Sequence, residues 1–163
     1  MSLRLAVEED LPQILAIYNA SIPEGKATAD TNPVTLEERR QWFLDHQRPE
    51  RPLWVYEQAD QLLGWMSLSD FYGRPAYAST AEISIYLHPE HQGRKLGQQL
   101  LDEALQAAKE LQLRSLLAFV FAHNEASVRL FRSRGFENWG LLPEVAWIKQ
   151  HPVSLSILGK KLD

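Results

Sequence analysis

Residues 83–97 decide how this chain folds, and they read Ile-Ser-Ile-Tyr-Leu-His-Pro-Glu-His-Gln-Gly-Arg-Lys-Leu-Gly. This pattern predicts a strand and a short loop of amides and cations, and the amphipathic stretch at 98–111 then predicts a helix. A helix begins with unpaired N–H groups and a dipole that favours anions, so the loop suits a phosphate group. Alternatively, Gly93 and Gly97 only shape a tight turn and allow close helix packing.

The composition is that of an ordinary globular chain. Its 163 residues suffice for one domain, 1–163, and include no cysteine, which excludes disulfides and thiolate chemistry. The net charge of −4 argues against a nucleic-acid partner. No metal is expected, because the five histidines show no pair at the helical spacing of zinc ligands. The lack of a signal peptide or a membrane-spanning apolar run predicts a cytoplasmic protein with no membrane partner.

The rest of the chain predicts helices and strands around one sheet, an α/β (α+β) fold. Strands are expected at 3–7, 53–57, 61–69, 80–87, 115–122, 136–148 and 153–162. Asp10, Thr35 and Asn124 are each expected to be the N-cap of a helix that follows directly. A further helix is expected at 97–111. Gly135 followed by Phe136 has the form of a Schellman stop. Residues 21–33 form a long loop of a kind that often binds ligands, and 70–79 form a second irregular loop.

This order of elements, joined to the loop at 92–97, resembles the GNAT superfamily of N-acetyltransferases. The superfamily likeness lies in residues 92–97 and 124–136. Within the superfamily, the chain is similar to the branch of phosphinothricin and methionine sulfoximine acetyltransferases. The branch likeness lies in residues 34–39, 72–77, 80–86 and 138–143. The resemblance covers nearly the whole chain and is more specific for the fold and the CoA site than for the substrate.

The resemblance implies a three-layer α/β/α GNAT fold with a mixed, mostly antiparallel sheet. The sheet is expected to splay between the strands at 80–87 and 115–122, where acetyl-CoA binds. The pyrophosphate is expected on the N–H groups of 92–97, and the pantetheine on the strand backbone at 86–88. The implied cofactor-binding residues are Tyr86, Leu87, His88, Gln92, Gly93, Arg94, Lys95, Leu96, Gly97, Asn124, Ser127 and Phe131.

Lys95 departs from the superfamily loop pattern, Q/R-x-x-G-x-G/A, because it replaces a glycine. If the backbone at this position still approaches the phosphate, the side chain must point outward, and its ammonium group then adds attraction. If the backbone does not approach, the loop has a different shape.

Glu82 is the candidate general base. In the strand at 80–87, Glu82, Ser84 and Tyr86 share one face, since alternate residues of a strand point the same way. A carboxylate within an otherwise apolar strand is desolvated, which raises its pKa towards a useful value. The strand pattern allows equally a glutamate on an edge strand, facing water or paired with an arginine. The resemblance implies a catalytic role, acting through a water molecule.

Phe131 stands where many members of the superfamily have a tyrosine that acts as general acid. A phenyl ring cannot donate a proton, but a thiol with a pKa of about 8.5 leaves as a thiolate with little help. Tyr86 or His123 could replace the acid, although His123 equally suits a structural role at a strand end. A strand N–H is expected to polarise the reacting carbonyl.

The resemblance assigns substrate recognition to the irregular loops. The implied substrate-binding residues are Tyr72, Arg74 and Tyr77, together with Glu82. Arg74 is expected to grip a carboxylate through two hydrogen bonds. Taken alone, Arg74 is typical of a solvated loop arginine, and the tyrosines are typical of packing beneath a loop. Residues 148–154 lack the Trp-x-Asp element common in this branch, which leaves the substrate open.

The sequence therefore predicts an enzyme that transfers an acetyl group from acetyl-CoA to the primary amine of a small amino-acid-like substrate. Phosphinothricin, methionine sulfoximine and methionine sulfone are the expected types, and detoxification is the expected role. One alternative is another amine, such as an antibiotic, a polyamine or a protein N-terminus. The other is a non-catalytic CoA-binding regulator. The resemblance also implies a homodimer.

Overall fold

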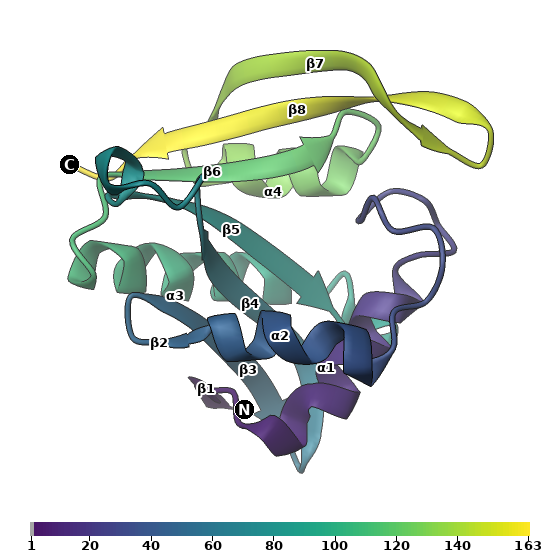
Figure 1. The fold of residues 1–163 in the computed structure, drawn as a ribbon, viewed down its shortest axis with the longest axis vertical. Coiled ribbons are helices and arrows are strands. Elements are labelled where there is room, and N and C mark those ends of the chain that lie inside the picture. Colours follow the sequence, from purple (N-terminus) through teal and green to yellow (C-terminus); the bar gives the residue numbers. More distant parts are fainter. Residues whose placement is uncertain (1) are drawn as a thin grey trace.

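The computed structural model describes residues 2–163 as a twisted open sheet with helices on both faces (Figure 1). The strands are β1 (Ser2–Leu5), β2 (Gln47–Arg48), β3 (Arg51–Gln58), β4 (Gln61–Asp70), β5 (Thr80–Leu87), β6 (Ser115–Phe121), β7 (Glu137–Ile148) and β8 (His151–Lys161). The longer helices are α1 (Leu11–Ala20), α2 (Leu36–Asp45), α3 (Leu96–Glu110) and α4 (Glu125–Ser133). The sheet order is β1-β3-β4-β5-β6-β8-β7, and β2 pairs with β3. None of the helices in the described range has both the length and the apolarity needed to cross a membrane.

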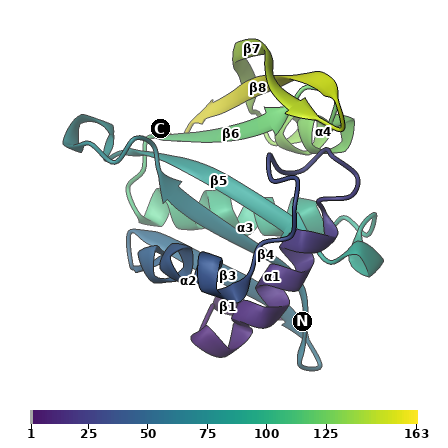
Figure 2. The same cartoon turned by 45° about the vertical axis from the view of Figure 1, so that its right-hand side comes forward.

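Helices cover both faces of the sheet, which confirms the three layers (Figure 2). On one face, Val55 and Trp65 of the sheet are buried in a cluster with Phe43 of α2. On the other face, Ile83 is buried in a second cluster with Leu100 of α3. Alternate residues of a strand point to opposite faces, so β4 and β5 contribute to both clusters. This burial on both faces fixes the orientation of β5, the strand that carries Glu82.

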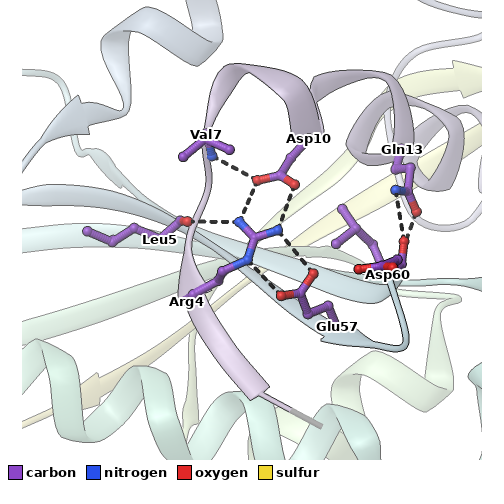
Figure 3. Close-up of polar contacts among 8 residues, drawn as sticks. Arg4, Leu5, Val7, Asp10, Gln13, Glu57 and Asp60 are labelled. Carbon is purple, nitrogen blue, oxygen red and sulfur yellow. Dashed lines mark hydrogen bonds and ion pairs between the residues drawn. The ribbon is translucent and has the colours of Figure 1, made fainter.

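The sequence predicts that the Asp10 side chain caps α1, but this side chain makes no capping hydrogen bond to the helix. Asp10 ends a 3-10 turn before α1, and its carboxylate accepts hydrogen bonds from the Val7 N–H at 2.8 Å and from Arg4 at 2.8 and 2.9 Å (Figure 3). Burial acts to raise the pKa of Asp10, but the hydrogen bonds from Arg4 and Val7 outweigh it and lower that pKa. Arg4 also pairs with Glu57 at 2.9 Å, so the N-terminal strand is tied to α1 and to β3.

Both ends of α4 form as the sequence predicts. The Asn124 side chain accepts a hydrogen bond from the Ser127 N–H at 3.2 Å. At the other end Gly135 has a φ of +86°, and the Phe136 N–H reaches the Phe131 carbonyl at 3.2 Å. The two phenyl rings lie 5.1 Å apart, which supplies the hydrophobic contact of a Schellman motif. The other expected cap is also confirmed, since the Thr35 side chain accepts from the Glu38 N–H.

The closing hairpin turns earlier than expected. The turn lies at Lys149 and Gln150, which have φ values of +49° and +66° and are the first two of the four residues left between the expected strands at 136–148 and 153–162. His151 and Pro152 instead begin β8 and pair with the end of β7. Two consecutive residues of positive φ match the twist of a two-residue hairpin, and this conformation was not evident from the residue types at these positions.

β5 and β6 separate part of the way along, as the family resemblance implies. They are parallel, whereas the other neighbouring strands of the sheet are antiparallel. Their pairing runs only from Thr80 opposite Ser115 to Glu82 opposite Leu117. β5 nevertheless continues to Leu87, so the edge that it turns towards β6 has no strand partner beyond Glu82. The mixed, mostly antiparallel and splayed sheet is confirmed.

Candidate active site

A cavity of about 440 Å³ occupies the opening between β5 and β6. Its walls come from these two strands, from the loop between α1 and α2, from the start of α4 and from the closing hairpin. The residues of the cavity wall that the sequence singled out are Glu82, Tyr86, Asn124, Ser127 and Phe131. The fold therefore gathers into one cavity residues that lie up to 49 positions apart in the sequence (131 − 82).

Glu82 is the one carboxylate in the described wall of this cavity. It projects from β5, which lies between β4 and β6, so the alternative of a glutamate on an edge strand is wrong. Burial raises the pKa of Glu82 above its usual value, and no charged or hydrogen-bonding neighbour contributes to this shift. The side chain is thus a desolvated carboxylate that faces the opening of the sheet.

Tyr86 shares the face of Glu82 but is already engaged. Its ring stacks on Trp65 with centroids 4.8 Å apart, and its hydroxyl donates to the Ala27 carbonyl at 2.9 Å. Burial, aided by the nearby Tyr18, raises the pKa of Tyr86 well above its usual range. Tyr86 is therefore a neutral hydroxyl that fastens the loop between α1 and α2.

The loop at 92–97 leads into α3 with a left-handed residue. Lys95 immediately precedes the helix with φ +60° and ψ +16°, its side chain is exposed, and no side chain caps the first turn. Gly93 also has a positive φ, and Gly97 lets Leu130 approach, since an added Cβ would lie 3.2 Å from that side chain. The glycines thus shape the turn and the helix packing. The first N–H groups of α3 still have no side-chain cap, as an anion site requires.

Two histidines, His88 and His91, lie close together beside this loop. The rings of His88 and His91 have centroids 5.2 Å apart, and ligand atoms of both and of Glu90 lie within 4.8 Å of one another. The two histidines are three positions apart at a 3-10 turn, so they do not form a pair at the helical spacing of zinc ligands. In addition, the His88 Nδ1 accepts the Glu90 N–H at 3.1 Å, so its lone pair is already used.

The three candidate substrate residues of the loop between β4 and β5 lie outside the wall of this cavity. Tyr72 is 75% exposed, and Arg74 is exposed with no ion-pair partner among the described residues. Phe71 connects the loop to the cavity, since its ring lies 6.4 Å from that of Phe119 in the cavity wall. Tyr72 and Tyr77 pack around Phe71, with ring centroids 4.4 and 5.4 Å away. Arg74 therefore belongs to the loop whose aromatic cluster contacts the cavity wall through Phe71.

Hydrogen bonds from several side chains hold the loop between α1 and α2 beside the cavity. The sequence did not indicate that these side chains act together. Its carbonyls at Pro23, Gly25, Lys26 and Ala27 accept hydrogen bonds from Lys149, His123, Asn124 and Tyr86 respectively. The sequence predicted a binding loop at 21–33, but the donors come from three distant segments: β5, the residues between β6 and α4, and the turn between β7 and β8. His123 bonds Gly25 at 3.0 Å and lies in a neighbouring cavity, which favours its structural role.

Comparison with known proteins places these features in a family. Residues 12–136 match the model of the acetyltransferase (GNAT) family. A Bacillus subtilis (strain 168) protein with the provisional name phosphinothricin acetyltransferase YwnH is 47% identical over 163 residues, which cover 99% of each chain. The L-methionine sulfoximine/L-methionine sulfone acetyltransferase of Pseudomonas aeruginosa is 35% identical, over 99% of this chain and 95% of its own. The crystal structure of a phosphinothricin acetyltransferase from Sinorhizobium meliloti in complex with AcCoA has a TM-score of 0.93 and 30% identity, and the match covers 99% of this chain and 88% of that one.

The chain therefore belongs to the acetyltransferase (GNAT) family, as its sequence predicts. It is an acetyl-CoA-dependent N-acetyltransferase, which sets aside the alternative of a non-catalytic regulator. The residues present suit acetyl-CoA. The open edge of β5 offers backbone groups to its amides, and the uncapped start of α3 offers N–H groups to its phosphates.

Proposed function

We propose that this enzyme acetylates the α-amine of a small amino-acid-like substrate of the phosphinothricin, methionine sulfoximine or methionine sulfone type. Glu82 is the general base and acts through a water molecule. The observation that carries the proposal is the position of Glu82, a desolvated carboxylate in the wall of the cavity between β5 and β6. The relatives named for these substrates match over nearly the whole chain, which supports the same substrate class.

The chemistry explains why a desolvated carboxylate suits this reaction. An amino-acid amine is protonated near neutral pH and must lose a proton before it can attack a thioester. A base is most effective when its pKa lies close to the working pH, and burial moves the pKa of Glu82 in that direction. Acetyl-CoA, when bound, supplies the thioester that the amine attacks. Glu82 accepts the proton through the water, and an N–H of β5 polarises the carbonyl.

We assign the pantetheine to the backbone of β5 at 86–88, because that edge has no strand partner. We assign the pyrophosphate to the N–H groups of 92–97. The exposed Lys95 supports this assignment, because its ammonium group lies in solvent beside an uncapped helix start. Asn124, Ser127 and Phe131 supply the opposite wall. The candidate acids Tyr86 and His123 both donate hydrogen bonds to loop carbonyls, so neither proton is directed at the leaving group. This favours departure of CoA as a thiolate with little help from an acid.

We assign the substrate carboxylate to Arg74, which has no ion-pair partner among residues 2–163 and lies in the loop whose Phe71 packs beside Phe119. Tyr72 and Tyr77 of the same loop supply apolar contacts to the rest of the substrate. A guanidinium group grips a carboxylate with two parallel hydrogen bonds, which selects amino acids over simple amines.

We further propose that the enzyme is a homodimer that uses the outer surface of β7. Five large apolar side chains of β7 are exposed: Trp139, Leu141, Leu142, Val145 and Trp147. β7 is also the last strand of the sheet, so its outer edge has no strand partner. An exposed edge strand with contiguous apolar side chains is a typical interaction surface. Val145 and Ala146 also line the cavity, so a second copy on β7 would adjoin the active site.

A thiol-release assay with acetyl-CoA tests the proposed substrate class. The panel contains phosphinothricin, methionine sulfoximine, methionine sulfone, spermidine, an aminoglycoside and a short peptide. We expect turnover of the first three alone. Faster turnover of a polyamine, an antibiotic or a peptide would replace the proposed substrate while leaving the family assignment intact.

A further inference from the structure

A buried histidine lies on the same side of the sheet as Glu82. Glu82 faces α1 and α2, and its direct neighbour on β4 is Ser69, which is paired opposite it. Opposite side chains of an antiparallel pair have Cβ atoms about 5 Å apart, so the Ser69 hydroxyl is within reach of the carboxylate. The ring of His46, at the end of α2, approaches Ser69 on this face of the sheet. The Nε2 atom of His46 lies 2.9 Å from the Oγ atom of Ser69. His46 is only 7% exposed.

The hydrogen bonds of His46 determine where the Ser69 proton points. The other ring nitrogen, Nδ1, lies 2.8 Å from the Trp42 carbonyl, and a carbonyl can only accept. Nδ1 therefore carries the proton. In the neutral ring Nε2 then has a free lone pair, so its contact with Ser69 requires the hydroxyl to donate. The Ser69 proton consequently points at His46 and away from Glu82.

Burial is the main reason that His46 stays in this neutral form. Burial is the largest effect and lowers the pKa of His46, Arg39 and Arg48 act in the same direction, and the Trp42 carbonyl and Asp45 oppose them. The titratable groups that share the surroundings of Glu82 are Tyr86 on its own strand and Lys26 across the cavity. None of these groups donates a hydrogen bond to the Glu82 carboxylate.

We propose that His46 is a positioning residue for the acetyl-transfer site: it holds the Ser69 hydroxyl proton away from Glu82, so that the carboxylate keeps its lone pairs for the proton of the substrate. This inference rests on the proposed function, because it concerns Glu82 as the base. A hydroxyl that donates to a carboxylate stabilises its charged form and weakens it as a base. His46 prevents that bond without touching substrate or cofactor.

The direct test is a titration of the Glu82 carboxyl by NMR in protein labelled with 13C at the glutamate side-chain carboxyls. The Glu82 signal is assigned by its loss in Glu82→Gln. We expect His46→Leu to free the Ser69 proton and to lower the pKa of Glu82 by about one pH unit, the size of one hydrogen bond to a charged group. We expect Ser69→Ala alone to leave this pKa unchanged, because the hydroxyl does not donate to Glu82 in the wild type.

The double variant separates this effect from general damage. Adding Ser69→Ala to His46→Leu removes the freed donor, so the Glu82 pKa should return to the wild-type value, whereas a loosened α2 would not be repaired. His46→Gln keeps one donor and one acceptor and should titrate like the wild type. If His46→Leu does not fold, the titration of Ser69→Ala alone still tests where the Ser69 proton points. In the wild type, the 15N spectrum of His46 should show a neutral ring protonated at Nδ1.

Two results would overturn the inference: an unchanged Glu82 titration in His46→Leu, or a raised pKa in Ser69→Ala alone, which would mean that Ser69 already donates to Glu82. Failure of the proposed function looks different. If Glu82→Gln turned over the substrate at the wild-type rate, Glu82 would not be the base, yet the NMR titration would still report where the Ser69 proton lies.

Discussion

Single residues set the protonation states on which the site depends, and Glu82 is the main example. Burial raises the pKa of Glu82 above its usual value. As the pH falls through this raised pKa, Glu82 takes up a proton and can no longer accept one from the amine. We therefore expect kcat/KM to fall on the acid side at a pH above about 4.3, the usual glutamate pKa.

Glu82→Gln should remove the proposed base with little change in shape. We expect kcat to fall by about 10²- to 10⁴-fold, the usual contribution of a general base, and the acid side of the pH profile to flatten. Steady-state thiol release over a range of pH measures both. Glu103→Gln on the exposed surface of α3 is the matched control. An unchanged rate in Glu82→Gln would remove Glu82 from the mechanism.

Asp10→Asn should destabilise the fold, because it breaks the partly buried pair with Arg4, in which the Asp10 side chain is 8% exposed and that of Arg4 is 36% exposed. We expect a loss of about 2 kcal/mol in the free energy of unfolding, measured by urea titration at pH 7. The pKa of Asp10 is lowered in the folded state, so its contribution is present above the unfolded pKa of about 4 and is lost as the pH falls below it.

The matched control for Asp10→Asn is Glu8→Gln. Glu8 pairs with Arg40 at 2.7 Å, but the two side chains are 60% and 64% exposed. An exposed pair of this kind contributes less than about 1 kcal/mol. Equal losses in the two variants, or a difference between wild type and Asp10→Asn that persists well below pH 4, would contradict the role assigned to the partly buried pair.

At the scale of elements, the loop before α3 combines a strained backbone with the proposed pyrophosphate site. Lys95 has a left-handed backbone, which favours glycine. Lys95→Gly should therefore raise the free energy of unfolding by about 1 kcal/mol. Loss of the ammonium group should also raise the KM for acetyl-CoA about two- to fivefold. Lys95→Ala separates the two effects, because it should raise the KM equally without the gain in stability. A KM unchanged in both variants would argue against pyrophosphate binding at this loop.

The second prediction at this scale concerns substrate binding by the loop between β4 and β5. If Arg74 binds the substrate carboxylate, Arg74→Ala should raise the KM for amino-acid substrates about 10- to 100-fold, since bonds to charged groups contribute about 1.5–3 kcal/mol. Amines without a carboxylate should be unaffected, and Arg132→Ala on α4 should behave like the wild type. An equal rise for both classes of amine would show that Arg74 acts on the fold of the loop and not on the carboxylate.

At the scale of the whole molecule, the exposed apolar surface of β7 predicts association. Sedimentation equilibrium of the wild type should give twice the mass of one chain. Trp147 is 67% exposed, and Trp147→Glu should shift the equilibrium to a single chain, because a charge buried in an apolar contact is costly. Leu44→Glu on α2, at a side chain 52% exposed, is the control and should remain dimeric. A wild type with the mass of one chain would contradict the proposed homodimer.

Much of the local structure could be predicted from the sequence. The strand at 80–87, the cap at Asn124 and the stop at Gly135 all form as expected, because each depends on residues within one or two turns of one another. The predicted cap at Asp10 does not form, because the Arg4 guanidinium group and the Val7 N–H both bind the Asp10 carboxylate. Glu57, which completes the network of Arg4, comes from a strand 53 residues away.

The sequence by itself determined the family, the order of elements and the identity of Glu82 as a candidate base. Only the tertiary structure showed where β5 and β6 part, since both stretches are typical of strands along their whole length and nothing in either marks Glu82 as the last paired residue. It also brought His46 to Ser69, opposite Glu82, and held the loop between α1 and α2 with side chains from three segments. The physical reason is that residue patterns encode local dihedral preferences and burial, whereas the separation of strands and the direction of a shared proton depend on groups that meet only after packing.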